Sequence, residues 1–326
     1  MNYTPEKKGP GRGAFPFLAA SILRFVMILG KILKKFQFFS AMLRETRHEV
    51  YENRVLMGKL LSMQTREINS IQDAEFKVFS QYGDDGIIQY LIKAASIRSH
   101  SFVEFGVETY VESNTRFLLI NNNWTGLVLD GSDQNIAYIR SDPFFWQHHL
   151  IANQAFITAE NINSLLTDAG FKGPLGLLSI DIDGNDYWVW KAIDAVDADI
   201  VVVEYNSLFG PERPVTVPYQ PDFVRSKAHY SYLYFGASLA ALCDLATEKG
   251  YSFVGCNSTG LNAYFVKSTQ LGSLKPLTAA EGYVYSKFRE GRDPDGKLTY
   301  ATGDDRIEII RGLPVFNTRT QAVEPF

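Results

Sequence analysis

The stretches Phe102-Val-Glu-Phe-Gly106 and Leu127-Val-Leu-Asp130 decide the fold. Each is a short apolar run bounded by turn residues, which predicts a strand buried on both faces of a sheet. Between them, Ser113-Asn-Thr115 precedes an apolar segment and is typical of a helix start. Strand, helix and strand in this order predict a mainly parallel sheet covered by helices.

The same alternation continues over residues 74–270, with short turns that contain Gly, Asn and Asp. Seven strands are predicted, at residues 101–105, 126–130, 149–153, 175–181, 199–204, 251–256 and 261–267. Helices are predicted between them, at residues 84–95, 113–121, 133–140, 159–169, 186–193 and 237–249. Asn257-Ser-Thr-Gly260 is too short for a helical crossover, so the last two strands must pair antiparallel. We therefore expect an α/β, Rossmann-like sheet of seven strands that closes with a C-terminal antiparallel hairpin.

Composition is that of an ordinary soluble globular protein, with 46% hydrophobic and 21% charged residues. The formal net charge of -4 predicts no nucleic-acid partner. Cys243 and Cys256 have no neighbour at metal-ligand spacing, so we expect reduced core residues in a cytoplasmic protein. The first apolar stretch leads into more basic sequence without a small-residue cleavage site, which argues against a signal peptide.

Residues 1–73 differ in character from the rest and are expected to form a basic, helical N-terminal extension. Within residues 1–50, nine Lys and Arg stand against three Glu. Residues 15–39 are rich in Phe, Leu, Ile and Val, but Arg24 and Lys31 interrupt them before the roughly 20 apolar residues that a membrane span needs. This pattern indicates a helix that does not cross a membrane.

Two interpretations of residues 15–39 remain open. Apolar bulk with scattered cations suits a helix lying on an anionic membrane surface, as on the inner face of a membrane, and it also suits an oligomerisation helix or one packed on the next domain. Residues 41–71 place apolar side chains among many charges, which is typical of an exposed helix or short coiled coil and predicts a homo-oligomer. At the other end, residues 271–326 are expected to pack over the domain as an extension.

Polar residues follow the first two strands, where ligands bind in an open α/β sheet. Gly106 would let the backbone approach a ligand and Glu104 could hold an ammonium group, although a strand that merely ends in a glycine turn gives the same pattern. Asp130 is placed to accept hydrogen bonds from both hydroxyls of a ribose. No Gly-x-Gly-x-x-Gly and no Gly-x-x-x-x-Gly-Lys-Ser/Thr follows the first strand, so a cofactor without phosphates fits better. The candidate cofactor-binding residues here are Glu104, Gly106, Asn114, Thr115, Asp130, Gly131 and Ser132.

The next two strand ends are acidic. Asp181 and Asp183 share one face of an extended backbone, Asp186 follows at a helix start, and Glu204 ends the fifth strand. Such carboxylates could bind a divalent cation such as Mg²⁺, with Asp181 and Asp183 as ligands, or one of them could act as a general base. The alternatives are structural, because Asp183-Gly184 suits a turn and Asp186 suits a helix cap.

A long segment, residues 210–234, is a candidate substrate lid because it exceeds an ordinary connection and carries several tyrosines. His229 within it is a candidate general base, with a role as a structural hydrogen-bond donor as the alternative. We expect the tyrosine hydroxyls and rings of this segment to suit sugar rings.

Several motifs together resemble the FkbM-type and related S-adenosylmethionine-dependent methyltransferases, over roughly residues 76–267. The resemblance rests on Phe79–Ile87, Val103–Val107, Glu112–Arg116, Trp124–Gly131 and Ser179–Gly184. It implies S-adenosylmethionine as cofactor, with Ser80 and Gln81 added to the residues that bind it, and methylation of hydroxyls on sugars or natural products. Asn185 departs from the family pattern, in which a small residue is common at that position.

The hypothesis is O-methyl transfer to a hydroxyl of a sugar or glycan, including a lipid-linked saccharide, or of a related metabolite. Asp181, Asp183, Glu204 and His229 are the candidate catalytic residues. Two other classes of protein compete with it: a non-catalytic scaffold with a methyltransferase-like fold, and an NAD-type oxidoreductase, which the first loop and the terminal hairpin disfavour.

Overall fold

The computed structural model describes residues 1, 4–5, 15–64 and 68–326. They divide into two compact units, Met1–Leu56 and Met57–Phe326. The predicted basic residues Lys7, Lys8 and Arg12, and residues 65–67 of the predicted second helical segment, lie outside the described residues.

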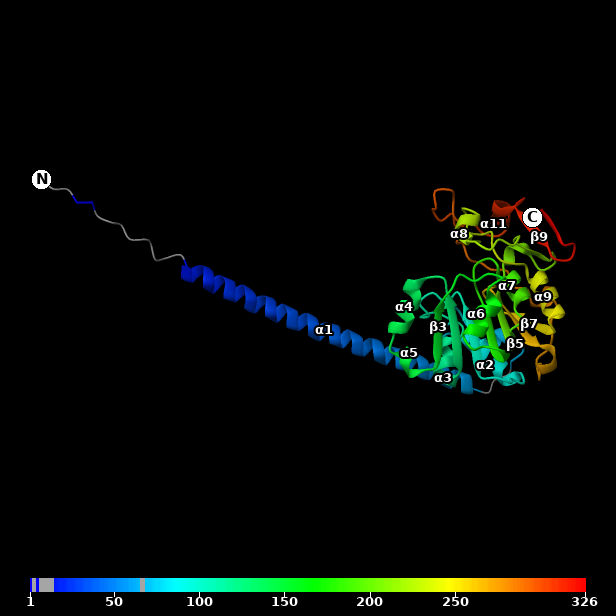
Figure 1. Cartoon of the computed structure of the whole chain (residues 1–326), viewed down its shortest axis with the longest axis horizontal. Coiled ribbons are helices and arrows are strands. Elements are labelled where there is room, and N and C mark those ends of the chain that lie inside the picture. The colour runs from blue at the N-terminus through cyan, green and yellow to red at the C-terminus, as the bar shows by residue number, and fades with distance from the viewer. Residues whose placement is uncertain (2–3, 6–14, 65–67) are drawn as a thin grey trace. The chain divides into compact units, whose positions relative to one another are not determined.

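Most of the first unit belongs to a single helix, α1 (Phe15–Met63), of 49 residues, whose residues 57–63 belong to the second unit (Figure 1). The sequence suggested two helical segments, and the structure joins them because residues 40–50 contain neither glycine nor proline to interrupt the backbone. Among the described residues, no helix is both long enough and apolar enough to cross a membrane.

The second unit is built on a seven-stranded sheet in the order β3-β2-β1-β4-β5-β8-β7. Its strands are β1 (Ser101–Phe105), β2 (Thr125–Asp130), β3 (Leu150–Gln154), β4 (Gly173–Ile180), β5 (Val196–Glu204), β7 (Tyr251–Cys256) and β8 (Asn262–Lys267). The first five are parallel, and β8 runs antiparallel to both β5 and β7. The predicted Rossmann-like sheet with a terminal hairpin is therefore confirmed.

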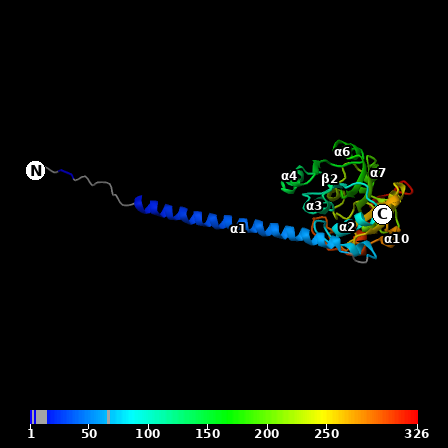
Figure 2. The same cartoon turned by 90° about the horizontal axis from the view of Figure 1, so that it is seen from below.

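Helices cover both faces of this sheet (Figures 1 and 2). One face carries α6 (Ile162–Asp168), α7 (Asp186–Ala192) and α9 (Leu239–Glu248). The other carries η1 (Ile71–Ala74), α2 (Asp84–Ala94), α3 (Arg116–Asn122), α4 (Asp133–Ser141) and α5 (Phe144–Gln147). Neighbouring strand residues point to opposite faces, so Val103 packs in the first core and Phe102 in the second, both fully buried.

A smaller part with its own apolar core follows β5. Its sheet has the order β10-β9-β6, formed by β6 (Val215–Thr216), β9 (Pro314–Asn317) and β10 (Ala322–Pro325). The remaining elements are η2 (Ser207–Phe209), α8 (Arg225–Ala228), η3 (Ser268–Gln270), α10 (Ala279–Gly282) and α11 (Asp304–Ile310). In this part, residues 207–236 pack against the C-terminal extension. The extension is also bonded to the end of the large sheet, because the hydroxyl of Tyr205, which follows β5, donates to the carbonyl of Val284 at 2.5 Å.

Candidate active site

A cavity of about 510 Å³ opens at the carboxyl ends of the parallel strands. Loops after β1, β2, β3 and β4, the end of β5 and the segment around α8 all contribute to its wall. The parallel strands bring these loops to one edge of the sheet, as the sequence predicted. The predicted site residues that line the cavity are Gln81, Glu104, Gly106, Asn114, Asp130, Gly131, Asp181, Asp183 and Glu204.

Glu104 closes the floor of the cavity at the end of β1. Its carboxylate accepts hydrogen bonds from the backbone N–H groups of Asn114 at 2.8 Å and Thr115 at 3.1 Å, and from the Thr115 hydroxyl. Burial raises the pKa of Glu104 to about 7 despite these hydrogen bonds. The carboxylate, which also bonds the Ser113 side chain, therefore fixes the start of α3.

Gly106 brings the loops after β1 and β4 into backbone contact. Its φ is +70°, and a Cβ built on it would lie 1.7 Å from the carbonyl oxygen of Asp181. No other amino acid fits this position without moving one of the two loops. The loop after β1 and the loop after β4 that carries Asp181 are thus packed backbone against backbone.

Asp130 at the end of β2 is nearly saturated with hydrogen bonds. Its Oδ1 accepts from Ser132 N at 2.8 Å and Asn135 Nδ2 at 2.9 Å, and its Oδ2 accepts from Glu108 N at 2.8 Å. One lone pair of Oδ2 remains, so Asp130 can accept one further hydrogen bond where the sequence suggested two. Gly131 has no atom within 4 Å of the Cβ position, which leaves open space beside this carboxylate.

Three predicted cofactor residues are outside the cavity lining. Ser80 is fully buried, and its N–H and hydroxyl both donate to Asp85 Oδ2, at 2.7 and 2.8 Å. Ser132 caps α4 by accepting from Asn135 N at 3.3 Å. Thr115 is buried beneath Glu104. These side chains shape the walls from behind.

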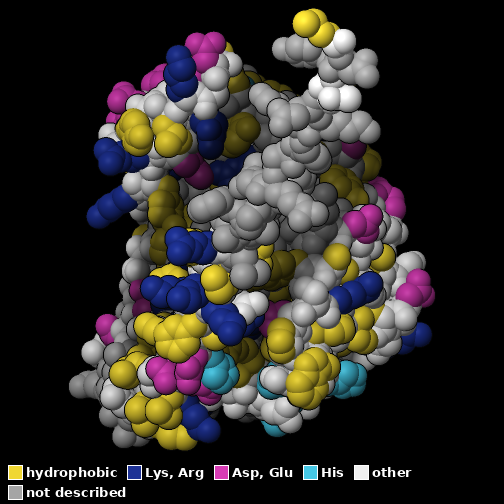
Figure 3. All heavy atoms as spheres, turned by 90° about the vertical axis from the view of Figure 1, so that its left-hand side faces the viewer, with side chains coloured by type: hydrophobic (Ala, Val, Ile, Leu, Met, Phe, Trp, Pro, Cys, Tyr) yellow, Lys and Arg dark blue, Asp and Glu magenta, His cyan; other side chains and the backbone are white. Residues whose placement is uncertain are grey.

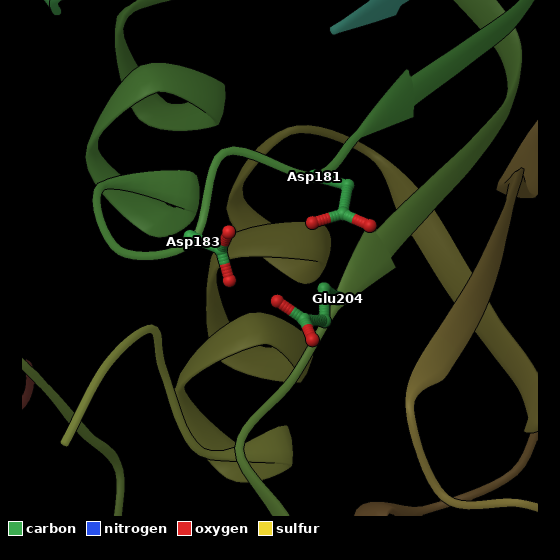
Figure 4. Close-up of side chains that lie close together, drawn as sticks. All are labelled: Asp181, Asp183 and Glu204. Atoms are coloured by element: carbon green, nitrogen blue, oxygen red, sulfur yellow. The ribbon is translucent and has the colours of Figure 1, made fainter. Parts of the chain in front are cut away.

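Asp181, Asp183 and Glu204 converge at the acidic side of the cavity (Figure 4). One carboxylate oxygen from each lies within 4.8 Å of the others. Asp186, which the sequence grouped with them, has a structural role: its oxygens accept from Ile182 N and Gly184 N, both at 2.9 Å. The loop between β4 and α7 is thereby folded so that Asp183, at φ +57°, points toward Glu204.

Burial governs the charge of this cluster. It raises the pKa of Asp181 well above its ordinary value, and the carboxylates of Asp183 and Asp186 add to that shift. It also raises the pKa of Glu204, with Asp181 as the next cause. Close carboxylates that are partly removed from water resist losing all their protons together.

Arg225 in α8 is a charged residue of the cavity lining that the sequence did not single out. Its guanidinium donates to Asp183 Oδ1 at 2.7 Å, to Glu290 Oε1 at 2.8 Å and to the carbonyl of Tyr232 at 2.7 Å. Burial lowers the pKa of Arg225, but the carboxylates of Glu204, Glu290 and Asp183 outweigh burial and raise it. One arginine among 32 Lys and Arg carried no local signal, since its partners are distant in sequence.

The predicted lid reaches the cavity through Phe223 and Arg225. Its tyrosines, Tyr230, Tyr232 and Tyr234, and its His229 are not among the described lining residues. The Nδ1 of His229 instead lies 2.7 Å from the Ser231 hydroxyl, and burial lowers the pKa of its ring. The structure thus places His229 in the structural position that the sequence left as its alternative.

No family model and no curated protein matches this chain. Among solved structures, it is similar to the O-methyltransferase from Bacillus cereus in complex with SAH, at 12% identity and a TM-score of 0.37, over 67% of this chain and 91% of that one. The precorrin-6y C5,15-methyltransferase from Geobacter metallireducens gives 12% identity and a TM-score of 0.36, over 59% and 91%. The CurJ carbon methyltransferase shows 13% sequence identity and a TM-score of 0.36. The match covers 58% of this chain and 53%, about half, of that protein. Likenesses this distant carry no argument about the reaction, which has to rest on the site of this chain.

Proposed function

We propose that this protein is an S-adenosylmethionine-dependent methyltransferase that methylates a hydroxyl oxygen. The observation that supports this most is the charge of the cavity. Its lining carries seven carboxylates, and Arg225 is the one Lys or Arg among the described lining residues. The carboxylates are those of Glu104, Glu108, Glu112, Asp130, Asp181, Asp183 and Glu204. A cavity of this sign favours a cationic ligand and disfavours one that carries phosphates.

This charge separates the proposed cofactor from a nicotinamide dinucleotide. A diphosphate needs a glycine-rich turn at a helix N-terminus, or cations, and the loop after β1 offers Glu108 and Glu112 instead. S-adenosylmethionine carries a sulfonium and an ammonium and no phosphate. Its nucleoside part fits the opposite end of the cavity, where Asp130 keeps a free lone pair and the half-exposed Phe156 offers an apolar surface.

The chemistry asked of the chain is positioning and proton removal. The acceptor's hydroxyl oxygen forms a bond to the methyl carbon as the bond from that carbon to sulfur breaks. The hydroxyl proton passes to a carboxylate of the Asp181, Asp183 and Glu204 cluster, and neutral S-adenosylhomocysteine is the other product. The close packing of Gly106 on Asp181 supports this arrangement, because it holds the loop after β1 beside the acidic cluster.

We propose a sugar or glycan hydroxyl as the acceptor, or that of a related metabolite. Its support is the hydrogen-bonding capacity of the acidic side. Asn185 lines the cavity with a buried Oδ1 that has no hydrogen-bond partner among the described residues, and Asn262 and Gln81 add further amides. Such groups recognise a polyhydroxylated ligand. The surrounding carboxylates oppose a phosphate next to the reacting oxygen, so the reacting unit is neutral.

Calorimetric titration of the full chain with S-adenosylmethionine tests the cofactor. We expect one site, and binding weakened at least about tenfold by Asp130→Ala, because a ribose hydroxyl would lose its acceptor. Asp133→Asn, which changes an exposed carboxylate three residues away, should bind like the wild type. No binding by the folded wild type would leave the scaffold alternative in place of the enzyme.

We further propose that α1 rests on an anionic membrane surface, at the inner face of the membrane. Its residues 24–43 expose many large apolar side chains, Phe25, Ile28, Ile32, Phe36 and Phe39 among them. Arg24, Lys31, Lys34 and Lys35 stand between these. Figure 3 shows hydrophobic side chains beside Lys and Arg side chains on the face that it draws. Apolar side chains and cations together are what an anionic lipid surface binds.

Liposome sedimentation tests whether α1 binds a membrane surface or instead serves for oligomerisation or packing. The full chain should sediment with phosphatidylglycerol-containing vesicles and a variant lacking residues 1–40 should not. Light scattering without lipid on the same two proteins then tests the homo-oligomer predicted for residues 41–71. Equal sedimentation of both proteins would mean that the anchor lies elsewhere.

A further inference from the structure

We propose that Asp181, Asp183 and Glu204 together bind one hard divalent cation, of the class of Mg²⁺, Mn²⁺ and Ca²⁺, at the acidic side of the cavity. The geometry fits, because one oxygen from each side chain lies within 4.8 Å of the others. Oxygens on opposite sides of a cation bound at about 2.3–2.6 Å stand about 5 Å apart and adjacent ones roughly 3.5 Å, so small side-chain rotations bring the three oxygens around Ca²⁺, and somewhat larger ones around Mg²⁺ or Mn²⁺. The three side chains come from two strand ends and one loop, and they point inward at the same space (Figure 4).

The buried state of Glu204 is the second, independent observation. Its side chain belongs to a residue that is only 8% exposed, and its Oε2 has no hydrogen-bond partner among the described residues. A buried carboxylate oxygen without a partner is costly, and buried charges are ordinarily paired or bound to a metal. A cation between Glu204 and the two aspartates removes that cost.

Arg225 does not supply the missing hydrogen bond. Its hydrogen bonds go to Asp183, Glu290 and the Tyr232 carbonyl, and among the described residues none goes from it to Asp181 or Glu204. It occupies Asp183 Oδ1, so the other oxygen of that exposed side chain is free to face the cation. One arginine against three carboxylates and Glu290 leaves an excess of negative charge that a divalent ion balances.

The consequence for catalysis rests on the proposed function. With three protein ligands, an octahedral ion keeps positions open toward the cavity, where water or the acceptor hydroxyl binds. A hydroxyl bound there would have a lower pKa than a free one, and it would give its proton more readily to a carboxylate oxygen of the cluster that does not bind the ion. The cation would thereby hold the acceptor oxygen beside the cofactor and activate it.

Titration of the full chain with Mn²⁺ alone, followed by the electron paramagnetic resonance signal of the free ion, tests the site. We expect one bound Mn²⁺ per chain, with binding weakened at least about tenfold by Asp183→Asn and by Glu204→Gln. Asp222→Asn is the matched control, since it changes an exposed carboxylate on the same lid segment outside the cavity lining. Thermal unfolding of every variant shows whether it folds. If Glu204→Gln does not fold, Asp183→Asn still tests the site, because Asp183 is exposed.

Absence of Mn²⁺ binding by the wild type at millimolar concentrations would overturn the inference, and so would equal binding by Asp183→Asn and Glu204→Gln. Calorimetry with S-adenosylmethionine in the presence of a chelator keeps the two proposals apart. Cofactor binding without Mn²⁺ binding leaves the methyltransferase and removes the cation. Mn²⁺ binding without cofactor binding leaves the cation site and removes the methyltransferase.

Discussion

At Gly106 the chain has room for a hydrogen atom and for nothing larger. The positive φ and the 1.7 Å approach of a built Cβ to the Asp181 carbonyl predict that Gly106→Ala lowers the free energy of unfolding by about 3 kcal/mol or more. Urea unfolding measures this. Gly131→Ala is the control, because its Cβ position meets no atom within 4 Å, and it should change stability by less than about 0.5 kcal/mol. Equal stability of the two variants would refute the contact.

Asp85 gives the fold a pH dependence of defined sign. Its Oδ2 accepts three backbone N–H groups and the Ser80 hydroxyl, its Oδ1 is buried without a partner among the described residues, and burial raises its pKa from 3.8 to about 6. The folded protein therefore binds this proton more tightly than the unfolded chain, and the contribution of Asp85 to stability falls as the pH rises from about 4 to about 6. Asp85→Asn keeps the accepting oxygen and removes the titration.

We expect the stability of Asp85→Asn relative to the wild type to increase between pH 4 and pH 7, by up to about 3 kcal/mol. Urea titrations of both proteins across this range give the difference directly. A difference that is constant with pH would show that Asp85 has the same pKa in the folded and unfolded chain.

For single residues, the sequence predicted which side chains lie at the carboxyl ends of the strands. Asp130, Asp181 and Glu204 each follow a buried strand, so their meeting at one edge could be predicted before any coordinates. It could not predict what each side chain bonds to. Glu104 is held by two N–H groups of a helix start, and Arg225 is placed by Asp183 and Glu290, contacts that exist only after the chain has folded.

The length of a helix or strand decides whether it could be predicted from the sequence. The seven strands of the large sheet, and α2, α3, α4, α6, α7 and α9 around them, repeat an apolar pattern over five residues or more, and all of these were predicted. The four-residue helix α5 was not predicted. β6 has two residues and α8 has four, too few to show a period. The position of β6 depends on pairing with β9, and that of α8 on the bonds of its Arg225 to Asp183 and Glu290; all these partners lie far away along the chain.

The short helix α8 is expected to depend on one side chain. Arg225→Lys keeps the charge but cannot bond Asp183, Glu290 and the Tyr232 carbonyl at once. Residues 219–235 should then exchange their amide hydrogens faster, which hydrogen exchange with mass spectrometry resolves. Lys227→Met changes an exposed cation of the same helix and should leave the rates alone. Unchanged exchange in Arg225→Lys would mean that the apolar core of the smaller part holds the lid by itself.

For the molecule as a whole, the boundary between the two units makes a prediction about truncation. Residues 57–63 of α1 belong to the second unit, where a Cβ at Gly58 would lie 2.3 Å from Val78 Cγ2 and Lys93 bonds the carbonyl of Ser62. A chain that starts at Met57 should keep the full-length thermal midpoint. One that starts at Ile68 loses this packing and should unfold several degrees lower. Equal midpoints for the two truncated chains would show that the end of α1 contributes no stability.

The pairing of β6 with β9 determines when the smaller part can fold during translation. Pro314 leaves the ribosome 98 residues after Thr216, yet the two strands form one sheet and share a core with Phe223 beside the cavity. The seven-stranded sheet can assemble as soon as β8 has been made, because all its strands lie upstream of residue 268. A nascent chain therefore passes through a period in which the acidic cavity exists and its cover does not. Chaperones that meet the nascent chain would encounter the uncovered apolar side of Phe223 during that interval.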